Sequence, residues 1–227
     1  MLHEPPETFT DEMTTPPNKE NLWVFRMVHY QNLPYILEHG MHCRRSTKAY
    51  NDYVNIGSTE IIGRRDTVTV KCDPTCVVND YVPFYFGVRS PMLYKIHTGY
   101  GVPQQPQEDI IYLCCRFVEL VGSDLECCFT DGNAATGITT FFTEEEEYSV
   151  LDWTSIYATE WHDNNKDGDH DRMRKKHAEF LVKGQVPPSF IRRIVVKTEE
   201  KQRLVEKWVS GTQLDISIYS NRPQFYF

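Results

Sequence analysis

The sequence predicts an α+β domain in which strands outnumber helices. Most apolar residues fall in short runs rich in β-branched and aromatic side chains, and turns rich in Gly, Pro, Asp and Asn separate these runs. Few segments carry helix-capping residues at both ends, and no segment is repeated. With 227 residues, 40% of them hydrophobic, the chain can bury one sizeable core, so residues 21–227 are expected to form a single domain.

The first organised unit is a strand followed by a short helix. Residues 22–28 are branched and aromatic, which is typical of a strand, and His29 follows it directly. Asn32 is expected to cap a helix over 33–38, and Gly40 is expected to end that helix.

The same two patterns predict the remaining elements. Six further runs are predicted as strands: 67–71, 110–120, 125–130, 178–182, 191–197 and 214–219. Helices are predicted at 91–98, 144–151 and 199–209. Thr198 should cap the last helix, and Gly211 should end it. The segments 50–65 and 161–171 are expected to be irregular loops, where functional residues often lie.

The N-terminus and the cysteines bear on where the protein works. Residues 1–20 hold four prolines among acidic and Thr residues, so we expect a disordered tail. The sequence lacks both a secretory signal pattern and a run of about 20 apolar residues. The adjacent pairs Cys114-Cys115 and Cys127-Cys128 are expected to be buried, reduced thiols. These features predict a soluble, cytoplasmic protein with no membrane partner.

The sequence patterns for metal sites and for phosphate-binding loops are incomplete. Residues 163–168 resemble the start of a calcium loop, but the twelfth position, which should be Glu, is Arg174. The sequence contains no C-x-x-C pair and no H-E-x-x-H. Gly99 and Gly101 are not followed by the third glycine of a dinucleotide-binding loop. We therefore expect no metal, and a nucleotide would have to be bound in another way.

Basic residues are concentrated in one part of a chain whose formal net charge is −8. Residues 172–208 hold eleven Lys or Arg against four Glu, a local balance of +7. This stretch could form one basic face that binds nucleic acid. Alternatively, its cations are distributed over ordinary solvated faces.

One carboxylate interrupts an apolar strand pattern. Alternation puts Ala178, Phe180 and Val182 on one face of the strand and Glu179 and Leu181 on the other. A buried carboxylate is costly unless it is paired. Glu179 is therefore either an edge-strand residue in a surface ion pair with the cations of 172–177, or a group that opposes positive charge on a reacting sugar.

His29 and the pair Arg64-Arg65 also have two interpretations. The imidazole could be a strand-end group bonded to nearby backbone, and the two arginines could be an ordinary solvated pair. The segment 81–94 is unusually rich in aromatic and polar residues. Spacing alone does not decide between a functional and a structural role for any of them.

Six ordered segments nevertheless form a familiar set. They are 28–40 (VHYQNLPYILEHG), 80–94 with its DYVPFYF and RSPMLY runs, 129–135 (FTDGNAA), 152–161 with Asp-Trp and Ile-Tyr, 178–182 (AEFLV) and 222–227 (RPQFYF). From about Trp23 to Phe227 the chain resembles the DarT family of DNA ADP-ribosyltransferase toxins. The resemblance implies an ADP-ribosyltransferase fold, related to poly(ADP-ribose) polymerases and diphtheria-type toxins, with a split β-sheet core and an NAD cleft.

The resemblance also implies roles for individual residues. Glu179 and Arg65 would be catalytic, with Arg65 favoured over Arg64 by spacing. NAD, consumed as a substrate, would contact His29, Asn32, Leu33, Gly40, Arg65, Met92 and Tyr94. Single-stranded DNA would contact Tyr50, Tyr53, Arg172, Arg174, Lys175 and Lys176.

The implied reaction transfers ADP-ribose from NAD to a base in single-stranded DNA, more like the thymidine branch of the family than the guanosine branch. Glu179 would hold a ribose hydroxyl and then take the proton from thymine N3, while Arg65 stabilises the resulting anion. The family also implies a toxin that blocks DNA replication and a macrodomain antitoxin of the DarG type as partner. Competing hypotheses are transfer to protein or RNA, a non-catalytic nucleic-acid-binding module and a metal-dependent nuclease.

Overall fold

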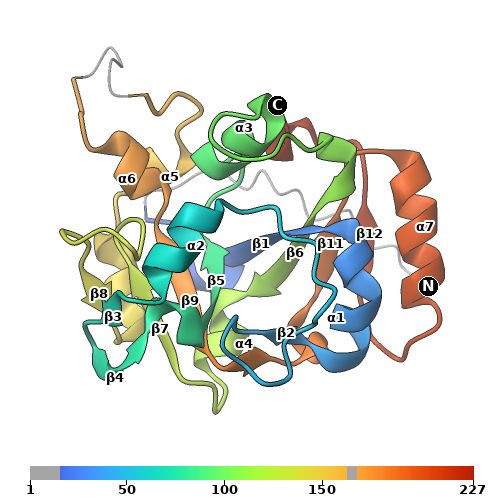
Figure 1. Ribbon diagram of the computed structural model, residues 1–227, viewed down its shortest axis with the longest axis horizontal. Coiled ribbons are helices and arrows are strands. Elements are labelled where there is room, and N and C mark those ends of the chain that lie inside the picture. Colours follow the sequence, from blue (N-terminus) through green and yellow to red (C-terminus); the bar gives the residue numbers. More distant parts are fainter. Residues whose placement is uncertain (1–15, 163–167) are drawn as a thin grey trace.

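An eight-stranded sheet is the main element of the computed structural model, which describes residues 16–162 and 168–227 (Figure 1). The strand order is β12-β11-β6-β1-β5-β9-β7-β8. These strands are β1 (Trp23–His29), β5 (Tyr81–Tyr85), β6 (Ile110–Arg116), β7 (Cys127–Thr130), β8 (Phe141–Phe142), β9 (Glu179–Lys183), β11 (Arg193–Val195) and β12 (Ser217–Tyr219). Neighbours are antiparallel except β11 and β12. Two separate pairs join β2 (Met41–His42) to β10 (Gln185–Val186) and β3 (Thr69–Val70) to β4 (Asp73–Val77).

Helices surround this sheet. They are α1 (Leu33–His39), α2 (Thr59–Arg65), α3 (Pro91–Thr98), α4 (Phe117–Val121), α5 (Trp153–Tyr157), α6 (Arg172–Lys176) and α7 (Glu199–Val209). Short 3-10 helices occupy Lys19–Asn21, Tyr30–Asn32, Val78–Asp80, Gln107–Asp109, Glu145–Val150, Pro188–Phe190 and Pro223–Phe225. In Figure 1, α7 lies along the β12 edge of the sheet and α2 lies in front of β5.

The sheet is split between β1 and β5. β1 pairs with β6 at seven positions, but with β5 only where Phe25 lies opposite Tyr85. β5 pairs normally with β9, over five positions. The two halves of the sheet therefore meet at one point and separate beyond it, which confirms the split sheet that the resemblance implies.

An aromatic core packs against one face of β9. The Phe180 ring meets that of Phe117 at 5.4 Å and that of Phe86 at 6.1 Å, and Phe86 meets Trp153 at 5.5 Å, all edge to face. Each such pair adds about 0.5–1.5 kcal/mol to the stabilisation from burial. These side chains fix the position of β9, the strand on which Glu179 lies.

The predicted alternation along β9 is confirmed. Ala178, Phe180 and Val182 belong to this aromatic core, whereas Leu181 belongs to a different apolar cluster on the opposite face. Glu179 therefore points away from the aromatic core, as its position in the pattern predicts.

Helices with clear capping residues are confirmed where the sequence predicts them. α3 matches the prediction 91–98, and α7 matches 199–209 with Thr198 Oγ1 accepting from Lys201 N at 3.2 Å. α7 ends at Val209 with Ser210 at its C-cap, and Gly211 is the next residue, as predicted. Gly40 ends α1 with a φ of 82°, and a Cβ there would lie 2.5 Å from the Val186 carbonyl oxygen. Glycine is the residue that adopts this positive φ without strain and has no Cβ to clash with the carbonyl.

Several predicted boundaries are wrong. The run 110–120 leaves the sheet after Arg116 and turns into α4, because an apolar run does not by itself distinguish a strand from a buried helix. The loop predicted over 50–65 contains α2, and the helix predicted over 144–151 is a 3-10 helix. The strands predicted at 67–71, 191–197 and 214–219 are shorter, and β5, α5 and α6 were not predicted.

The first described residues, from residue 16 on, pack against the segment that holds Glu145 and Tyr148. Tyr148 Oη donates to the Pro17 carbonyl oxygen at 3.1 Å, and Lys19 Nζ lies 2.9 Å from Glu145 Oε1. The predicted disordered tail, 1–20, thus overlaps an ordered segment, and its residues 1–15 lie outside the described residues.

All seven cysteines are free thiols. Cys114, Cys115 and Cys128 are buried, and Cys127 is partly buried, as expected for the adjacent pairs. Burial raises the pKa of Cys114 and of Cys115, so both thiols stay protonated and unreactive.

Candidate active site

A cavity of about 860 Å³ lies at the split in the sheet. Its walls come from β1, β5, β9, α2 and residues 43–58, the connection from β2 to α2, which we call the 43–58 loop. Its Arg and Lys lining residues are Arg26, Arg44, Arg64, Arg65, Lys95 and Arg174. Among the described lining residues, Glu179 is the single carboxylate. The cavity is cationic although the chain is anionic, which suits a ligand that carries phosphate groups.

Glu179 and Arg65 form a bidentate ion pair in the wall of this cavity. Arg65 Nη1 donates to Oε1 at 3.1 Å, and Nη2 donates to Oε2 at 2.9 Å. Glu179 is 1% exposed and Arg65 is 9% exposed. Burial opposes the charge on Arg65, but the Glu179 carboxylate outweighs this and raises the pKa of the guanidinium. Because an unpaired buried charge costs several kcal/mol, each side chain holds the other in place.

Local structure explains how two residues 114 positions apart meet. Ser58 Oγ accepts from Ile61 N at 3.4 Å and caps α2, whose last residue is Arg65. Glu179 is the first residue of β9, opposite Tyr85 of β5. The end of a capped helix and the start of a core strand therefore fix the two partners.

The segment 130–134 completes the bonding of Glu179. Ala134 N donates to Oε1 at 3.0 Å, and Glu179 N donates to Thr130 Oγ1 at 3.1 Å. A carboxylate offers about four lone-pair sites. Arg65 and Ala134 occupy two on Oε1, and Arg65 occupies one on Oε2. One site on Oε2 remains for a substrate hydroxyl.

Two further titratable side chains line the cavity beside Glu179. The Tyr85 and His177 ring centroids are 6.1 Å apart. Burial and the Glu179 carboxylate raise the pKa of Tyr85, whereas burial lowers the pKa of His177, so both groups are neutral at pH 7. Sequence reasoning missed both. Tyr85 lies in the aromatic segment 81–94 that the sequence singles out, whereas His177 lies two residues before Glu179, at the end of a helix that the sequence did not predict.

The structure brings together only part of the set assigned to NAD. Three of these residues line the cavity: Gly40, Arg65 and Met92. The other four are not part of its wall: His29, Asn32, Leu33 and Tyr94. Leu33 is fully buried in the core, and Tyr94 packs against Phe227 and Trp161.

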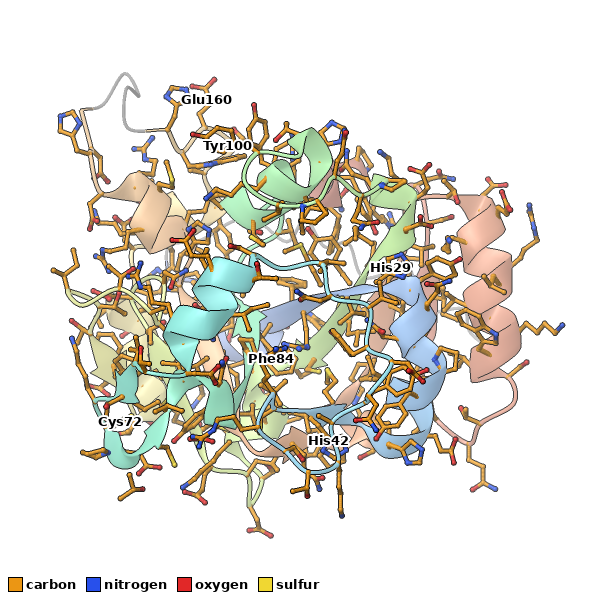
Figure 2. The ribbon with its side chains drawn as sticks, in the orientation of Figure 1. His29, His42, Cys72, Phe84, Tyr100 and Glu160 are labelled. Carbon is orange, nitrogen blue, oxygen red and sulfur yellow. The ribbon has the colours of Figure 1, made fainter. Side chains whose placement is uncertain are left out.

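The imidazole of His29 bonds to nearby backbone, as one of its two interpretations expects. It lies at the end of β1 beside α1, whereas His42, which lines the cavity, lies on β2 (Figure 2). Its Nδ1 accepts from Gln31 N at 3.3 Å. Burial lowers the pKa of the imidazole, so the ring is neutral at pH 7.

Asn32 does not cap α1 with its side chain, which corrects the sequence prediction. The buried amide instead binds the 43–58 loop: Nδ2 donates to the Val54 carbonyl oxygen at 2.9 Å, and Val54 N donates to Oδ1 at 2.8 Å. Asn32 thus acts on the cavity by holding one of its walls.

Replacing Asn32 by Ala is expected to loosen the 43–58 loop, because both Val54 backbone groups lose their partner at about 1–3 kcal/mol each. Limited proteolysis followed by mass spectrometry should show faster cleavage within 43–58. Asn55→Ala is the matched control, since the Asn55 amide bonds only to Gly57 inside the loop. Equal cleavage rates in both variants would contradict this role.

The residues assigned to DNA are also divided. Tyr50, Tyr53 and Arg174 line the cavity, with Tyr50 stacked on Tyr35 at 4.4 Å. Lys176 is buried at 3% exposure, where its Nζ donates to the Ile156 carbonyl oxygen at 2.9 Å and burial lowers its pKa to about 8. Lys176 is thus not placed to hold a phosphate.

Several cations of 172–208 pair with carboxylates on different parts of the fold, so they do not form one free basic face. Arg174 pairs with Asp131 and Asp171, and Lys175 pairs with Asp152 and Asp169. Further along, Lys183, Arg192 and Lys201 pair with carboxylates on three other parts of the fold. The nearby cations therefore do not neutralise Glu179, whose partner is Arg65.

Arg64 and Arg65 differ clearly in role. Arg64 Nη2 donates to the Ala135 carbonyl oxygen at 2.7 Å, whereas the Arg65 guanidinium is bonded to Glu179. Of the two, Arg65 is the one joined to the candidate catalytic carboxylate, as the sequence favoured.

In the described part of the chain, no three His, Cys, Asp or Glu side chains are arranged to hold a metal ion. No helix in this part is long and apolar enough to cross a membrane. The possible calcium loop at 163–168 lies almost wholly outside the described residues.

Comparison with known proteins decides the family. The family model described as "ssDNA thymidine ADP-ribosyltransferase, DarT" matches residues 25–227. The chain belongs to this family. A DNA ADP-ribosyl transferase of Escherichia coli O127:H6 is 32% identical over 211 residues, covering 92% of this chain and 95% of the relative.

Solved structures agree in fold. Thermus sp. 2.9 DarT in complex with ADP-ribosylated ssDNA superposes with a TM-score of 0.79 at 29% identity, covering 91% of this chain and 96% of that one. The same protein in complex with NAD+ gives 0.74 at 28% identity, with 93% and 99% coverage. This member of the DarT family thus has the ADP-ribosyltransferase fold and is an NAD-dependent DNA ADP-ribosyltransferase that acts on single strands, as the sequence predicts.

Proposed function

We propose that this chain transfers ADP-ribose from NAD to N3 of thymine in single-stranded DNA, with Glu179 and Arg65 at the reacting centre. The buried Arg65–Glu179 pair in the wall of a cationic cavity is the observation that supports this proposal most directly. The thymidine description of the matching family model favours thymine over guanine.

Glu179 orients the ribose and stabilises the positive charge that develops on it. Breaking the bond between ribose and nicotinamide leaves a cationic, oxocarbenium-like ribose, which a nearby carboxylate stabilises. The remaining lone-pair site on Oε2 accepts a ribose hydroxyl and orients the sugar. Arg65 and Ala134 N hold the carboxylate, so it needs little reorganisation during the reaction.

The cations around the cavity bind the phosphate groups of the two substrates. NAD brings a pyrophosphate and the DNA strand brings a phosphate at each nucleotide. Of the residues that the resemblance assigns to NAD, we retain Gly40, Met92 and Arg65 as direct contacts, with Asn32 acting through the 43–58 loop. Phosphates would contact Arg174, and Arg172 and Lys175 beside it, during DNA binding.

Single-stranded DNA fits because thymine N3 takes part in Watson–Crick pairing and is hidden in a duplex. Tyr50 and Tyr53, on the 43–58 loop, present aromatic faces on which an exposed base can stack. Stacking of this kind contributes about 1–3 kcal/mol per base.

The test uses adenine- and cytosine-based single strands that carry one thymine, one guanine or one 3-methylthymine. After incubation with NAD, mass spectrometry should show one added ADP-ribose on the thymine strand alone. The thymine strand annealed to its complement should stay unmodified. Addition to guanine would move the chain to the guanosine branch, and addition to 3-methylthymine would rule out N3 as the acceptor.

The proposed biological role is that of a toxin that blocks DNA replication, countered by a macrodomain antitoxin. Family membership supports this role. Induced expression in a bacterial host should stop DNA synthesis, measured by incorporation of labelled nucleoside, and co-expression of a macrodomain that removes the modification should restore it. Normal replication in the presence of folded, active protein would contradict the role.

A further inference from the structure

We infer that His177 is the general base that removes the N3 proton of the acceptor thymine, and that Glu179 serves only the ribose. This inference rests on the thymine acceptor proposed above. It divides between two residues the roles that the sequence gives to Glu179 alone.

The bonding of Glu179 makes it a poor base. Three of its four lone-pair sites accept hydrogen bonds from Arg65 and Ala134, and the fourth is needed for the sugar. Taking up a proton would also remove the charge that balances the buried Arg65, which costs several kcal/mol. The proton therefore needs another acceptor within the cavity.

His177 offers a lone pair in the right form. Its Nδ1 lies 2.9 Å from the Met173 carbonyl oxygen, and since a carbonyl can only accept, Nδ1 carries the proton. In the neutral ring, Nε2 then has a free lone pair. Among the described residues, Nε2 has no hydrogen-bond partner. It is also not one of the fully buried polar atoms that lack a partner, and His177 lines the cavity, so a ligand in the cavity can reach Nε2.

The surroundings of His177 keep it neutral. Burial lowers its pKa most, and Lys95 of α3 and Lys176 of α6 lower it further, against the opposing effects of the Met173 hydrogen bond and of Glu179 on β9. Tyr85 of β5 adds no charge, because its raised pKa keeps the phenol protonated. The neutral phenol can donate a hydrogen bond, for example to a thymine carbonyl, but its oxygen is too weak a base to take the N3 proton, whereas the imidazole of His177 can take it.

The proposed step balances without a co-reactant. The N3–H proton moves to His177 Nε2 as the N3 electron pair forms a bond to C1 of the ribose. The bond from that carbon to nicotinamide breaks, and its electron pair returns to the nicotinamide nitrogen, which leaves as a neutral molecule. The imidazolium then releases its proton to solvent.

The variant His177→Asn tests the proposal, because the Asn amide can still donate to Met173 while Nε2 is lost. We expect single-turnover transfer to thymine to fall about 10²–10⁴-fold, the range for loss of a general base. The dissociation constant for NAD should stay close to that of the wild type, because the proposed role of His177 concerns the acceptor base. His97→Gln is the matched control, since His97 stacks on Phe227 outside the cavity lining and should retain the full rate.

Two readouts separate a base from a structural residue. A strand carrying 5-fluorouracil, whose N3–H is more acidic than that of thymine, should recover most of the lost rate in His177→Asn. In the wild type, the rate should fall as the pH drops through the pKa of His177, which lies below 6.5, because the imidazole is then protonated. That acid limb should be absent from the variant.

Equal losses on thymine and 5-fluorouracil, an unchanged acid limb or an unchanged rate in His177→Asn would each overturn the role of His177. If His177→Asn does not fold, as judged by circular dichroism, His177→Gln gives the same comparison. A wild-type protein that leaves thymine unmodified would instead overturn the proposed acceptor, so the two failures are distinguishable.

Discussion

Replacing Glu179 by Gln is expected to lower the rate of ADP-ribose transfer by about a hundred- to a thousandfold. Gln keeps the size of the side chain but removes the negative charge that opposes the cationic ribose. The Gln amide has one acceptor oxygen instead of two, so one of the two hydrogen bonds from Arg65 is lost. The NH2 group, itself a donor, then faces a donor of Arg65. Single-turnover assays with saturating NAD and a thymine-containing strand measure the loss.

The variant should also be less stable. Arg65 loses its charged partner while remaining buried, so the free energy of unfolding is expected to fall by about 3 kcal/mol, measured by urea denaturation. Glu126→Gln is the matched control, because Glu126 pairs with Lys183 at an exposed position and such pairs contribute about 1 kcal/mol or less. A Glu179→Gln protein with wild-type rate and stability would contradict the assigned role.

Replacing Arg65 by Lys is expected to lower the transfer rate by about ten- to a hundredfold even though the charge is kept. A guanidinium donates two parallel hydrogen bonds to a carboxylate, whereas an ammonium on a flexible chain acts as a point charge. Glu179 would then lose one of the two hydrogen bonds that fix its carboxylate. The free lone pair on Oε2 would no longer be held in the direction of the ribose hydroxyl.

Arg64→Lys is the matched control for this substitution. Arg64 makes a single hydrogen bond to the Ala135 carbonyl oxygen, which Lys can also make, so a change of less than about fivefold is expected. A larger loss in Arg64→Lys than in Arg65→Lys would mean that the wrong arginine of the pair has been assigned.

The sequence pointed to Glu179 for a physical reason but could not identify its partner. A carboxylate in an apolar strand pattern requires a counter-charge, and the nearest cations in the sequence are those of 172–176. The structure pairs Arg174 and Lys175 with aspartates and brings Arg65 across from α2. Whether a cation near in the sequence or a distant one such as Arg65 reaches the carboxylate depends on how strands and helices pack. Only the resemblance indicated Arg65.

The fold was predictable where local signals were strong. The cap of α7 and the glycine after α1 set those helices correctly, and the alternation along β9 placed Glu179 on the face away from Phe180. The turn from β6 into α4 was not predictable, because the run 110–120 is apolar throughout. His177 was missed because it ends α6, a helix that the sequence did not predict, and because only the packing of that helix brings the ring beside Tyr85 in the cavity.

The most direct test of the central claim is the mass of a single-stranded oligonucleotide with one thymine after incubation with NAD. The wild type should add one ADP-ribose to that strand, and Glu179→Gln should add none in the same time. A wild-type protein that leaves the strand unmodified, or a Glu179→Gln protein that modifies it at the wild-type rate, would contradict the account of the Arg65–Glu179 pair as the reacting centre.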